Sequence, residues 1–251
     1  MKDQNEILKS NRWKDWNNDK TDQKKNIPAP PVQKPIPANA EHIDLVSPDQ
    51  LTCGTMPIIE AMQNRRSRRK FTGESIGAEE LSFLLWSTQG IDKIEELNKV
   101  TRTYRPVPSG GCRHPFETYL LINNVKGFEE GLYRYLPLEH KLILINPDLS
   151  LRKKIHDASY KQFVMTSALV FIWTVIPYRT EWRYSFLSPK LIAQDSGHLC
   201  QNLYLSCEAL RLGTCAIGSY DQEKMDQLID VDGEKEFTIY MAPVGRIKIK
   251  S

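Results

Sequence analysis

The sequence predicts an α+β fold in one domain, with an arm in front of it. Runs that alternate apolar and polar residues follow one another in the middle of the chain and are separated by short turns, which is typical of hairpins. Segments with helical spacing of apolar residues stand before and after these runs, and no segment is repeated. With 251 residues, 40% of them hydrophobic, the chain is long enough to bury a full core. Helices mixed with hairpins indicate the α+β class.

Residues 1–50 are expected to form the arm and residues 51–251 the folded domain. Trp13 and Trp16 stand among charged residues, and the segment 20–42, "KTDQKKNIPAPPVQKPIPANAEH", is rich in proline. Proline removes a backbone donor and fixes φ, so this segment forms neither a helix nor a central strand. We expect such an arm to lie along a surface or to stay flexible.

The domain opens with a predicted helix at 56–71, "MPIIEAMQNRRSRRKF". Pro57 suits the first turn of a helix, where a backbone donor is not needed. Ile58, Ile59 and Met62 then recur at helical spacing. The pattern therefore predicts one helix that reaches into the basic residues at its end.

The other elements follow from the same periodicities. They are, in chain order, a helix at 77–90, strands at 116–125, 131–137 and 140–146, a helix at 148–160, a strand at 168–176, helices at 188–213 and 221–230, and a strand at 237–249. The helix at 188–213 is apolar around most of its circumference. We expect it to be buried on all sides, either centrally or in a subunit interface.

The bulk properties exclude several classes of protein. A formal net charge of +3 is too small to indicate nucleic-acid binding. The longest apolar run, 168–176, has half the length of a membrane span, and the N-terminus lacks the apolar core of a signal peptide. These features predict a cytoplasmic protein without a membrane segment. The five cysteines form no C-x-x-C pair, so neither a metal site nor a disulfide framework is expected.

Two stretches stand out as candidate binding sites. The loop 105–116, "RPVPSGGCRHPF", holds glycines that let a backbone approach a ligand, between prolines that fix it. It contains no dinucleotide or P-loop motif, and a plain turn is the alternative. The run 64–71, "NRRSRRKF", places a serine among arginines, whose planar donors suit phosphate oxygens. Its alternative is a solvated, charged helix end.

Two further stretches carry weaker signals. The segment 213–222, "GTCAIGSYDQ", is predicted to connect two helices, with Gly213 as the helix stop. The segment 243–248, "PVGRIK", places Gly245 and Arg246 after an apolar strand, where a lone arginine is usually a surface residue. Each stretch has an ordinary structural interpretation when it is taken alone.

In their order and spacing the four stretches resemble the nitroreductase superfamily of FMN-dependent oxidoreductases, and within it the SagB/ThcOx-type dehydrogenases. The resemblance covers about residues 56–251. The matched motifs are R-x-S-x-[RK]-x-[FY] at Arg65, Ser67, Arg69 and Phe71, P-S-x-x-x-x-x-P at Pro108, Ser109 and Pro115, a long helix motif from Asp195 to Gly213, and P-V-G-R at 243–246.

The resemblance implies a nitroreductase-like fold, in which a central, mostly antiparallel sheet is flanked by helices, and an intertwined homodimer with FMN at the subunit interface. It implies hydride transfer through flavin N5 by a ping-pong mechanism, with NADH or NADPH as the expected donor. The residues that it assigns to FMN binding are Arg65, Arg66, Ser67, Arg69, Pro108, Ser109, Gly110, Gly111, Ile217, Gly218, Ser219, Gly245, Arg246 and Lys248.

Within this set the resemblance gives each group a role. The arginines and Ser67 would hold the phosphate and the pyrimidine edge of the flavin, with Arg246 and Lys248 completing the phosphate pocket. The loop at 108–111 would come from the other subunit and pack on the isoalloxazine. The backbone at 217–219 would point an N–H at flavin N5, which places Gly218 in the catalytic group.

Tyr184 is the second residue assigned to catalysis. Azoline oxidases of the same subgroup carry a lysine–tyrosine pair where this chain has Arg183 and Tyr184. Arginine stays charged near neutral pH and is a poor base, so a reductase or dehydrogenase with an unidentified small-molecule or peptide substrate is favoured. An azoline oxidase and a non-catalytic flavin-binding subunit of a peptide-modifying complex are the alternatives. Tyr184 could equally be a core or interface aromatic.

Overall fold

A computed structural model describes residues 5–97 and 100–248 of the chain. Seven strands in this part form one sheet in the order β1-β6-β5-β4-β7-β9-β8, and every ladder between them is antiparallel. The strands are β1 (His42–Asp44), β4 (Phe116–Ile122), β5 (Gly131–Leu136), β6 (Lys141–Asn146), β7 (Leu169–Val175), β8 (Leu212–Thr214) and β9 (Phe237–Arg246). The predicted α+β class with a mostly antiparallel central sheet is confirmed.

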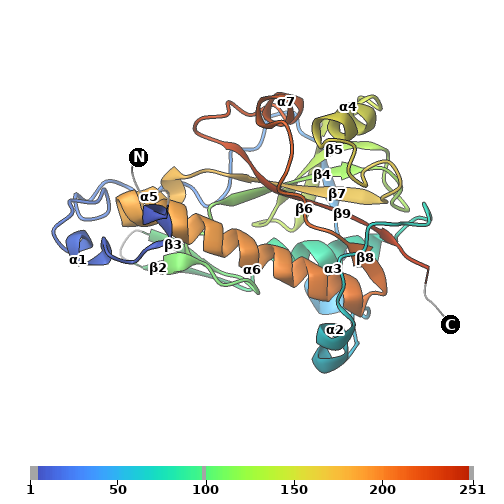
Figure 1. Cartoon of the computed structure of the whole chain (residues 1–251), viewed down its shortest axis with the longest axis horizontal. Coiled ribbons are helices and arrows are strands. Elements are labelled where there is room, and N and C mark those ends of the chain that lie inside the picture. The colour runs from blue at the N-terminus through green and yellow to red at the C-terminus, as the bar shows by residue number, and fades with distance from the viewer. Residues whose placement is uncertain (1–4, 98–99, 249–251) are drawn as a thin grey trace.

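Helices cover both faces of the sheet (Figure 1). They are α1 (Trp13–Trp16), α2 (Ile58–Asn64), α3 (Ala78–Gln89), α4 (Leu151–Ala158), α5 (Tyr178–Tyr184), α6 (Ser188–Ala209) and α7 (Gln222–Leu228), with short 3-10 turns at Glu6–Leu8, Pro48–Gln50, Gly110–Cys112 and Ser185–Leu187. Helices α3 and α6 lie on one face, and α4 and α7 on the other. Within the described ranges, no helix has the length and apolar character needed to cross a membrane.

The central strands β4 and β7 are buried along their whole length. Their side chains alternate between the two faces, so Leu120 and Trp173 join the core under α3 and α6, whereas Tyr119 and Ile172 join the core under α4 and α7. A strand buried on both faces reads as a continuous apolar run, as β7 does at 169–175.

Two predicted helices are shorter than their sequence patterns. The helix expected at 56–71 ends at Asn64, because the following residues run beside the sheet: Arg68 N donates to Thr214 O at 2.8 Å and Thr72 N to Arg246 O at 2.9 Å. The helix expected at 188–213 ends at Ala209, and Gly213 lies in the edge strand β8. The prediction that 213–222 connects two helices is therefore wrong at its start.

The expectation that the long helix is buried on all sides holds for only part of its surface. Gln194, Gly197, His198 and Gln201 are exposed and share one face of α6, at spacings of three and four residues. Within a single chain, α6 is thus packed on one side and open on the other.

Sequence patterns did not predict the hairpin of β2 (Lys93–Leu97) and β3 (Val100–Tyr104), nor α5, nor β1. Strand β2 carries two glutamates and a lysine and stays largely exposed, so it lacks the apolar alternation of a buried strand. The predicted strand at 237–249 ends at Arg246, and residue 249 lies outside the described ranges.

The arm packs along the body of the molecule. Trp182 exchanges hydrogen bonds with it: Gln23 N donates to Trp182 O at 2.9 Å, and Trp182 Nε1 donates to Ile27 O at 2.8 Å. Further along, Arg134 Nη2 donates to Pro35 O at 2.7 Å. These long-range bonds hold a proline-rich segment that has few hydrogen bonds of its own.

Candidate functional site

The basic segment after α2 lies next to the edge strand β8 and the end of β9. Arg68 is tied down by its backbone bond to Thr214 and by an ion pair with Glu208, at 3.6 Å from Nη2 to Oε1. Gly213 lies against the Arg68 side chain so closely that a Cβ there would stand 2.6 Å from Arg68 Cβ. The close approach requires glycine at 213 and fixes the course of the segment.

Three arginines of the basic segment have no acidic partner in the part of the chain that the structure describes. Among the residues that the structure describes, no carboxylate oxygen lies within 4.0 Å of the side-chain nitrogens of Arg65, Arg66 or Arg69. The Arg65 guanidinium lies 5.3 Å from the centroid of the Tyr204 ring, and Arg66 Nη1 donates only to backbone carbonyls. The surface here therefore carries uncompensated positive charge, which suits an anionic ligand.

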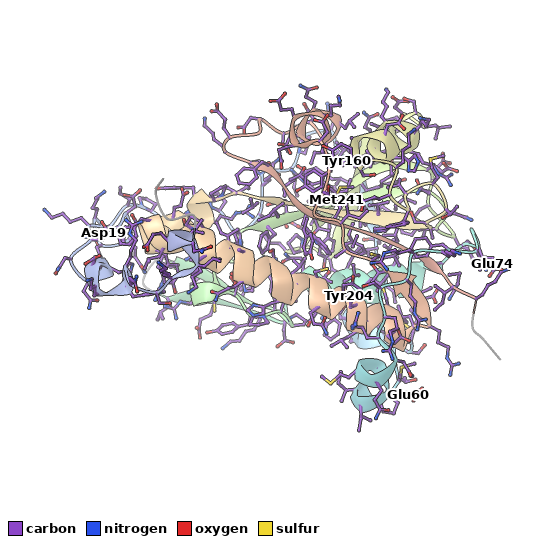
Figure 2. All side chains as sticks on the ribbon, viewed as in Figure 1. Asp19, Glu60, Glu74, Tyr160, Tyr204 and Met241 are labelled. Carbon is purple, nitrogen blue, oxygen red and sulfur yellow. The ribbon has the colours of Figure 1, made fainter. Side chains whose placement is uncertain are left out.

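Tyr204, on α6, connects this segment to the segment at 217–219. Its hydroxyl lies 3.2 Å from Ser67 Oγ and accepts a hydrogen bond from Ala216 N at 2.8 Å. Ile217 pairs with Met241 of β9 through backbone bonds of 2.7 and 3.1 Å. Figure 2 shows Tyr204 on α6, below Met241 in the sheet. The basic segment and the 217–219 segment are thus brought together.

The backbone at Gly218 and Ser219 is open. Both residues are exposed, and a Cβ placed on Gly218 would meet only the Tyr240 ring, at 3.9 Å. Ser219 O accepts a hydrogen bond from Gln162 Nε2 at 2.8 Å, which holds the segment from the far side. A ligand could therefore approach the backbone at Gly218 without displacing a side chain.

The loop at 108–111 lies elsewhere along α6. Ser109 Oγ donates to Asp195 Oδ2 at 2.6 Å and accepts from His114 N at 2.9 Å, and Gly110 N donates to the same carboxylate at 3.1 Å. Burial raises the pKa of the Asp195 carboxyl, while the bonds from Ser109 and Gly110 oppose that rise. Asp195 therefore fixes the loop through Ser109 and Gly110.

Gly111 has a left-handed backbone, with φ of +61°. A Cβ at this position would stand 2.6 Å from the Tyr184 hydroxyl and 3.0 Å from Arg183 Cδ. Only glycine satisfies both the conformation and the contact. Pro108, two residues before Gly110, is exposed and begins the loop.

One chain does not bring the loop and the basic segment into a single site. Asp195 and Tyr204 are nine residues apart on α6, which corresponds to about 14 Å along the helix axis at 1.5 Å per residue. Within the chain, the residues assigned to cofactor binding therefore form two groups. One lies near Asp195 and the other near Tyr204.

Arg246 is engaged by a carboxylate. Its Nη1 and Nη2 donate to the two oxygens of Glu80 at 2.8 and 2.7 Å, and Glu80 Oε2 also accepts from Gly77 N at the start of α3. Gly245 packs against the Phe71 ring, whereas Lys248 is exposed beyond the end of β9. The geometry gives Arg246 a role in holding α3 to β9; its predicted contact with phosphate stays a prediction.

Tyr184 is buried under the arm. Its ring stacks on Trp16 at a centroid distance of 6.0 Å and meets Trp13 edge-on at 6.1 Å. Trp16 Nε1 also donates to Arg183 O at 3.3 Å. The ring of Tyr184 is thus covered by the arm, and its hydroxyl lies next to Gly111 of the loop.

The polar residues of the segment 105–116 that lie outside 108–111 have structural roles. Arg105 is half-buried and donates to Gln89, and the desolvation of its guanidinium lowers its pKa to about 10. Arg113 lies over the Trp182 ring at 5.1 Å. Burial, aided by the positive charge of Arg105, lowers the pKa of His114 to about 2, so its imidazole is neutral at physiological pH.

Sequence patterns did not single out Tyr204, Glu80 or the paired tryptophans as site residues. Asp195 is a matched position of the helix motif, whereas Tyr204 stands at a position that the motif leaves unspecified. The contacts of both residues could not be derived from spacing alone. Glu80 appears in the sequence only as an acidic residue in the first turn of α3.

A Tyr204→Phe variant is expected to lose about 1–3 kcal/mol of unfolding free energy, because Ala216 N and Ser67 Oγ lose their partner. It should also weaken flavin binding, measured by fluorescence titration. Tyr133→Phe is the matched control: it removes a single bond to Glu129 O, away from the basic segment and from 217–219, and should leave flavin binding unchanged. Equal flavin affinity in both variants would contradict the linking role of Tyr204.

Comparisons with known proteins agree with the geometry. A model of the nitroreductase family matches residues 62–246. A Methanocaldococcus jannaschii protein described as a nitroreductase is 29% identical over 188 residues, which cover 74% of this chain and 89% of that protein. The trifolitoxin-processing protein TfxB of Rhizobium leguminosarum bv. trifolii is 28% identical over 133 residues, which cover 51% of this chain and 36% of TfxB.

Solved structures show the same fold. A protein of Ralstonia eutropha JMP134, described as a nitroreductase, has a TM-score of 0.66 at 24% identity and covers 89% of this chain and 100% of its own. The Escherichia coli microcin synthetase McbBCD complex, with truncated pro-MccB17 bound, contains a chain with a TM-score of 0.59 at 18% identity, over 86% of this chain and 84% of that one. Since the family model spans more than half of the sequence, the chain belongs to the nitroreductase family.

Proposed function

We propose that this chain is an FMN-dependent oxidoreductase that acts as a homodimer and takes its two substrates in turn, in a ping-pong mechanism. Nitroreductase-family proteins generally use a flavin. The single observation that carries the proposal is the group of three arginines with no carboxylate partner among the described residues, joined through Ser67 and Tyr204 to the open backbone at 217–219.

The donor chemistry of this group suits FMN. Arg65, Arg66 and Arg69 supply forked, permanently charged donors for a phosphate that brings about two negative charges. Ser67 adds a hydroxyl beside them. Cationic groups at the pyrimidine edge also favour the reduced, anionic form of a flavin. The open position at Gly218 leaves room for a flat ring system against the backbone.

When bound, FMN would supply hydride transfer at its N5 atom. The role of the chain's own residues is to hold the cofactor and to orient its ring. The backbone N–H in the 217–219 segment would donate to N5, and the two bonds between Ile217 and Met241 keep that segment at a fixed distance from the sheet. Tyr204 ties the same segment to Ser67, so the phosphate side and the ring side of the site move together.

A homodimer would join the two separated groups. In the proposed assembly, Pro108, Ser109, Gly110 and Gly111 pack on the isoalloxazine held by the partner subunit. The open face of α6 at Gly197, His198 and Gln201 would be covered by the partner, as would the apolar side chains of α2, where Ile58, Ile59 and Met62 are 60–64% exposed. Figure 1 shows α2 projecting from the body of the chain.

The substrate is a small molecule or a peptide, and NADH or NADPH is the proposed electron donor. An azoline oxidase is the second candidate, supported by the contact of Tyr184 with Gly111 and by the likeness to TfxB and to the McbBCD chain. Arg183 in place of a lysine argues against it, because a guanidinium is a poor base. A non-catalytic flavin-binding subunit of a peptide-modifying complex would keep the flavin residues and lack turnover.

Steady-state kinetics with NADPH or NADH and menadione as the acceptor would test the mechanism. Parallel lines in double-reciprocal plots are expected, because the first product leaves before the acceptor binds. Intersecting lines would contradict the ping-pong proposal. A flavin that binds but supports no turnover with any donor would favour the non-catalytic alternative.

A further inference from the structure

We propose that the arm and the first two turns of α6 form a binding site for a small organic acid, an apolar body of one or two rings that carries a carboxylate. The claim that this acid is a substrate rests on the proposed function, because the site adjoins the loop assigned there to the flavin. The binding site itself stands on the contacts given below.

A cavity of about 330 Å³ lies between the arm and the start of α6. Its apolar lining comes from both sides: Ile7 and Trp13 belong to the arm, and Leu187 and Leu191 to the body. Although the arm is packed down, Ile7 stays 55% exposed and Trp13 36% exposed. Ligand pockets span about 300–1,000 Å³, so this volume suits one or two rings rather than a dinucleotide.

Cations outnumber carboxylates around the cavity. Among the described residues that line it, three are cationic, Lys9, Arg12 and Lys190, and one is a carboxylate, Glu6, so their net formal charge is +2. Lys9 Nζ pairs with Glu6 at 2.8 Å. Within the described ranges, no carboxylate oxygen lies within 4.0 Å of the side-chain nitrogens of Arg12 or Lys190. The excess positive charge selects an anionic ligand.

The two uncompensated cations are held by neutral groups. Arg12 Cζ lies over the Phe186 ring, 3.8 Å from the ring centroid, and a guanidinium held by a ring face keeps N–H donors for another group. Lys190 Nζ donates one hydrogen bond to Ser10 Oγ at 2.9 Å and has two further donors. An apolar floor with charged donors at its edge is the arrangement that binds an amphipathic acid.

The cavity borders the loop at 108–111. A Cβ built on Gly110 would lie 3.6 Å from Leu191 Cδ2, and Leu191 lines the cavity. Trp13 lines it too and meets the Tyr184 ring edge-on at 6.1 Å. The N-terminal end of α6 adds partial positive charge on the same side, since Pro189 and Lys190 both line the cavity. A bound acid would therefore lie beside the proposed flavin wall.

Calorimetric titration of the full-length protein with 2-naphthoate, and separately with the neutral 2-naphthalenemethanol, tests the proposal. We expect one naphthoate per chain and an affinity at least tenfold above that of the alcohol. Arg12→Gln and Lys190→Gln should each reduce naphthoate affinity about threefold to tenfold and leave alcohol affinity unchanged, whereas Trp13→Ala should weaken both. Lys14→Gln, which removes a neighbouring exposed cation outside the cavity, is the matched control.

Equal affinity for the acid and the alcohol, no binding of either, or an equal loss in Lys14→Gln would overturn the proposal. Because Arg12, Lys14 and Lys190 make no ion pair with a described carboxylate, unchanged thermal midpoints are expected for these variants and check that each is folded. The titration needs no flavin. A protein that binds naphthoate as expected but binds no FMN would support this site and refute the proposed function. A protein that binds FMN but not naphthoate would refute this site and leave the proposed function standing.

Discussion

A Glu117→Gln variant is expected to lose about 3–5 kcal/mol of unfolding free energy, because it leaves the Arg179 guanidinium buried without its counter-charge. The two side chains are 2% and 3% exposed and form an ion pair in which Arg179 Nη2 donates to Glu117 Oε1. Lys34 N of the arm donates to the same carboxylate oxygen at 2.9 Å, and Arg179 Nε donates to Pro31 O at 2.9 Å. The loss should therefore release the arm as well as destabilise the sheet.

Urea unfolding measures this loss, and the cleavage rate of the arm by a protease measures its release. Glu139→Gln is the matched control, since the exposed Glu139 side chain bonds, among the described residues, only the Gln33 side chain of the arm; a change within about 0.5 kcal/mol is expected. The double variant Glu117→Gln/Arg179→Met should lose less than the sum of its single variants, because no buried charge remains. A loss below about 1 kcal/mol in Glu117→Gln would contradict the role of this pair.

The second large effect concerns the basic segment. Arg65→Gln and Arg69→Gln are each expected to raise the Kd for FMN by about 10- to 150-fold, which corresponds to about 1.5–3 kcal/mol for a hydrogen bond to a charged group. Neither guanidinium has a described carboxylate within 4.0 Å, so the loss of charge should cost little stability. Quenching of flavin fluorescence on titration gives the Kd.

The control for this prediction is Lys153→Gln, which removes an exposed cation from α4 on the other face of the sheet. It should leave the Kd for FMN unchanged. Raising the ionic strength should weaken FMN binding by the native chain more than by the arginine variants, because the variants have lost part of the electrostatic attraction. An unchanged Kd in both arginine variants would remove the basic segment from the site.

The sequence predicted well those elements whose pattern is set by burial. Strand β7 reads as a continuous apolar run because both faces are covered, and β4 pairs with it along its whole length. The end of α2 was not predictable in the same way. Arg65 and the residues after it have helix-compatible side chains, and they leave the helix because Thr214 and Arg246, which are distant in sequence, accept hydrogen bonds from their backbone.

The site shows the same division. The motif order predicted that the arginine segment and the 217–219 segment serve one ligand, and Tyr204 joins them. Spacing could not show that Arg246 is engaged by Glu80, nor that Asp195 fixes the loop, because both contacts depend on how helices pack on the sheet. The burial of Tyr184 under Trp13 and Trp16 likewise depends on where a proline-rich arm comes to rest.

The central claim is that this chain holds a redox-active FMN. The most direct measurement is an absorbance spectrum of the purified protein mixed with FMN and freed of excess, followed in the same cuvette by anaerobic NADPH and then NADH. We predict flavin bands at one FMN per chain that bleach on addition of a pyridine nucleotide. A colourless protein that cannot be loaded with FMN would contradict the site described here, and a yellow protein that neither nucleotide bleaches would contradict its use of NADH or NADPH.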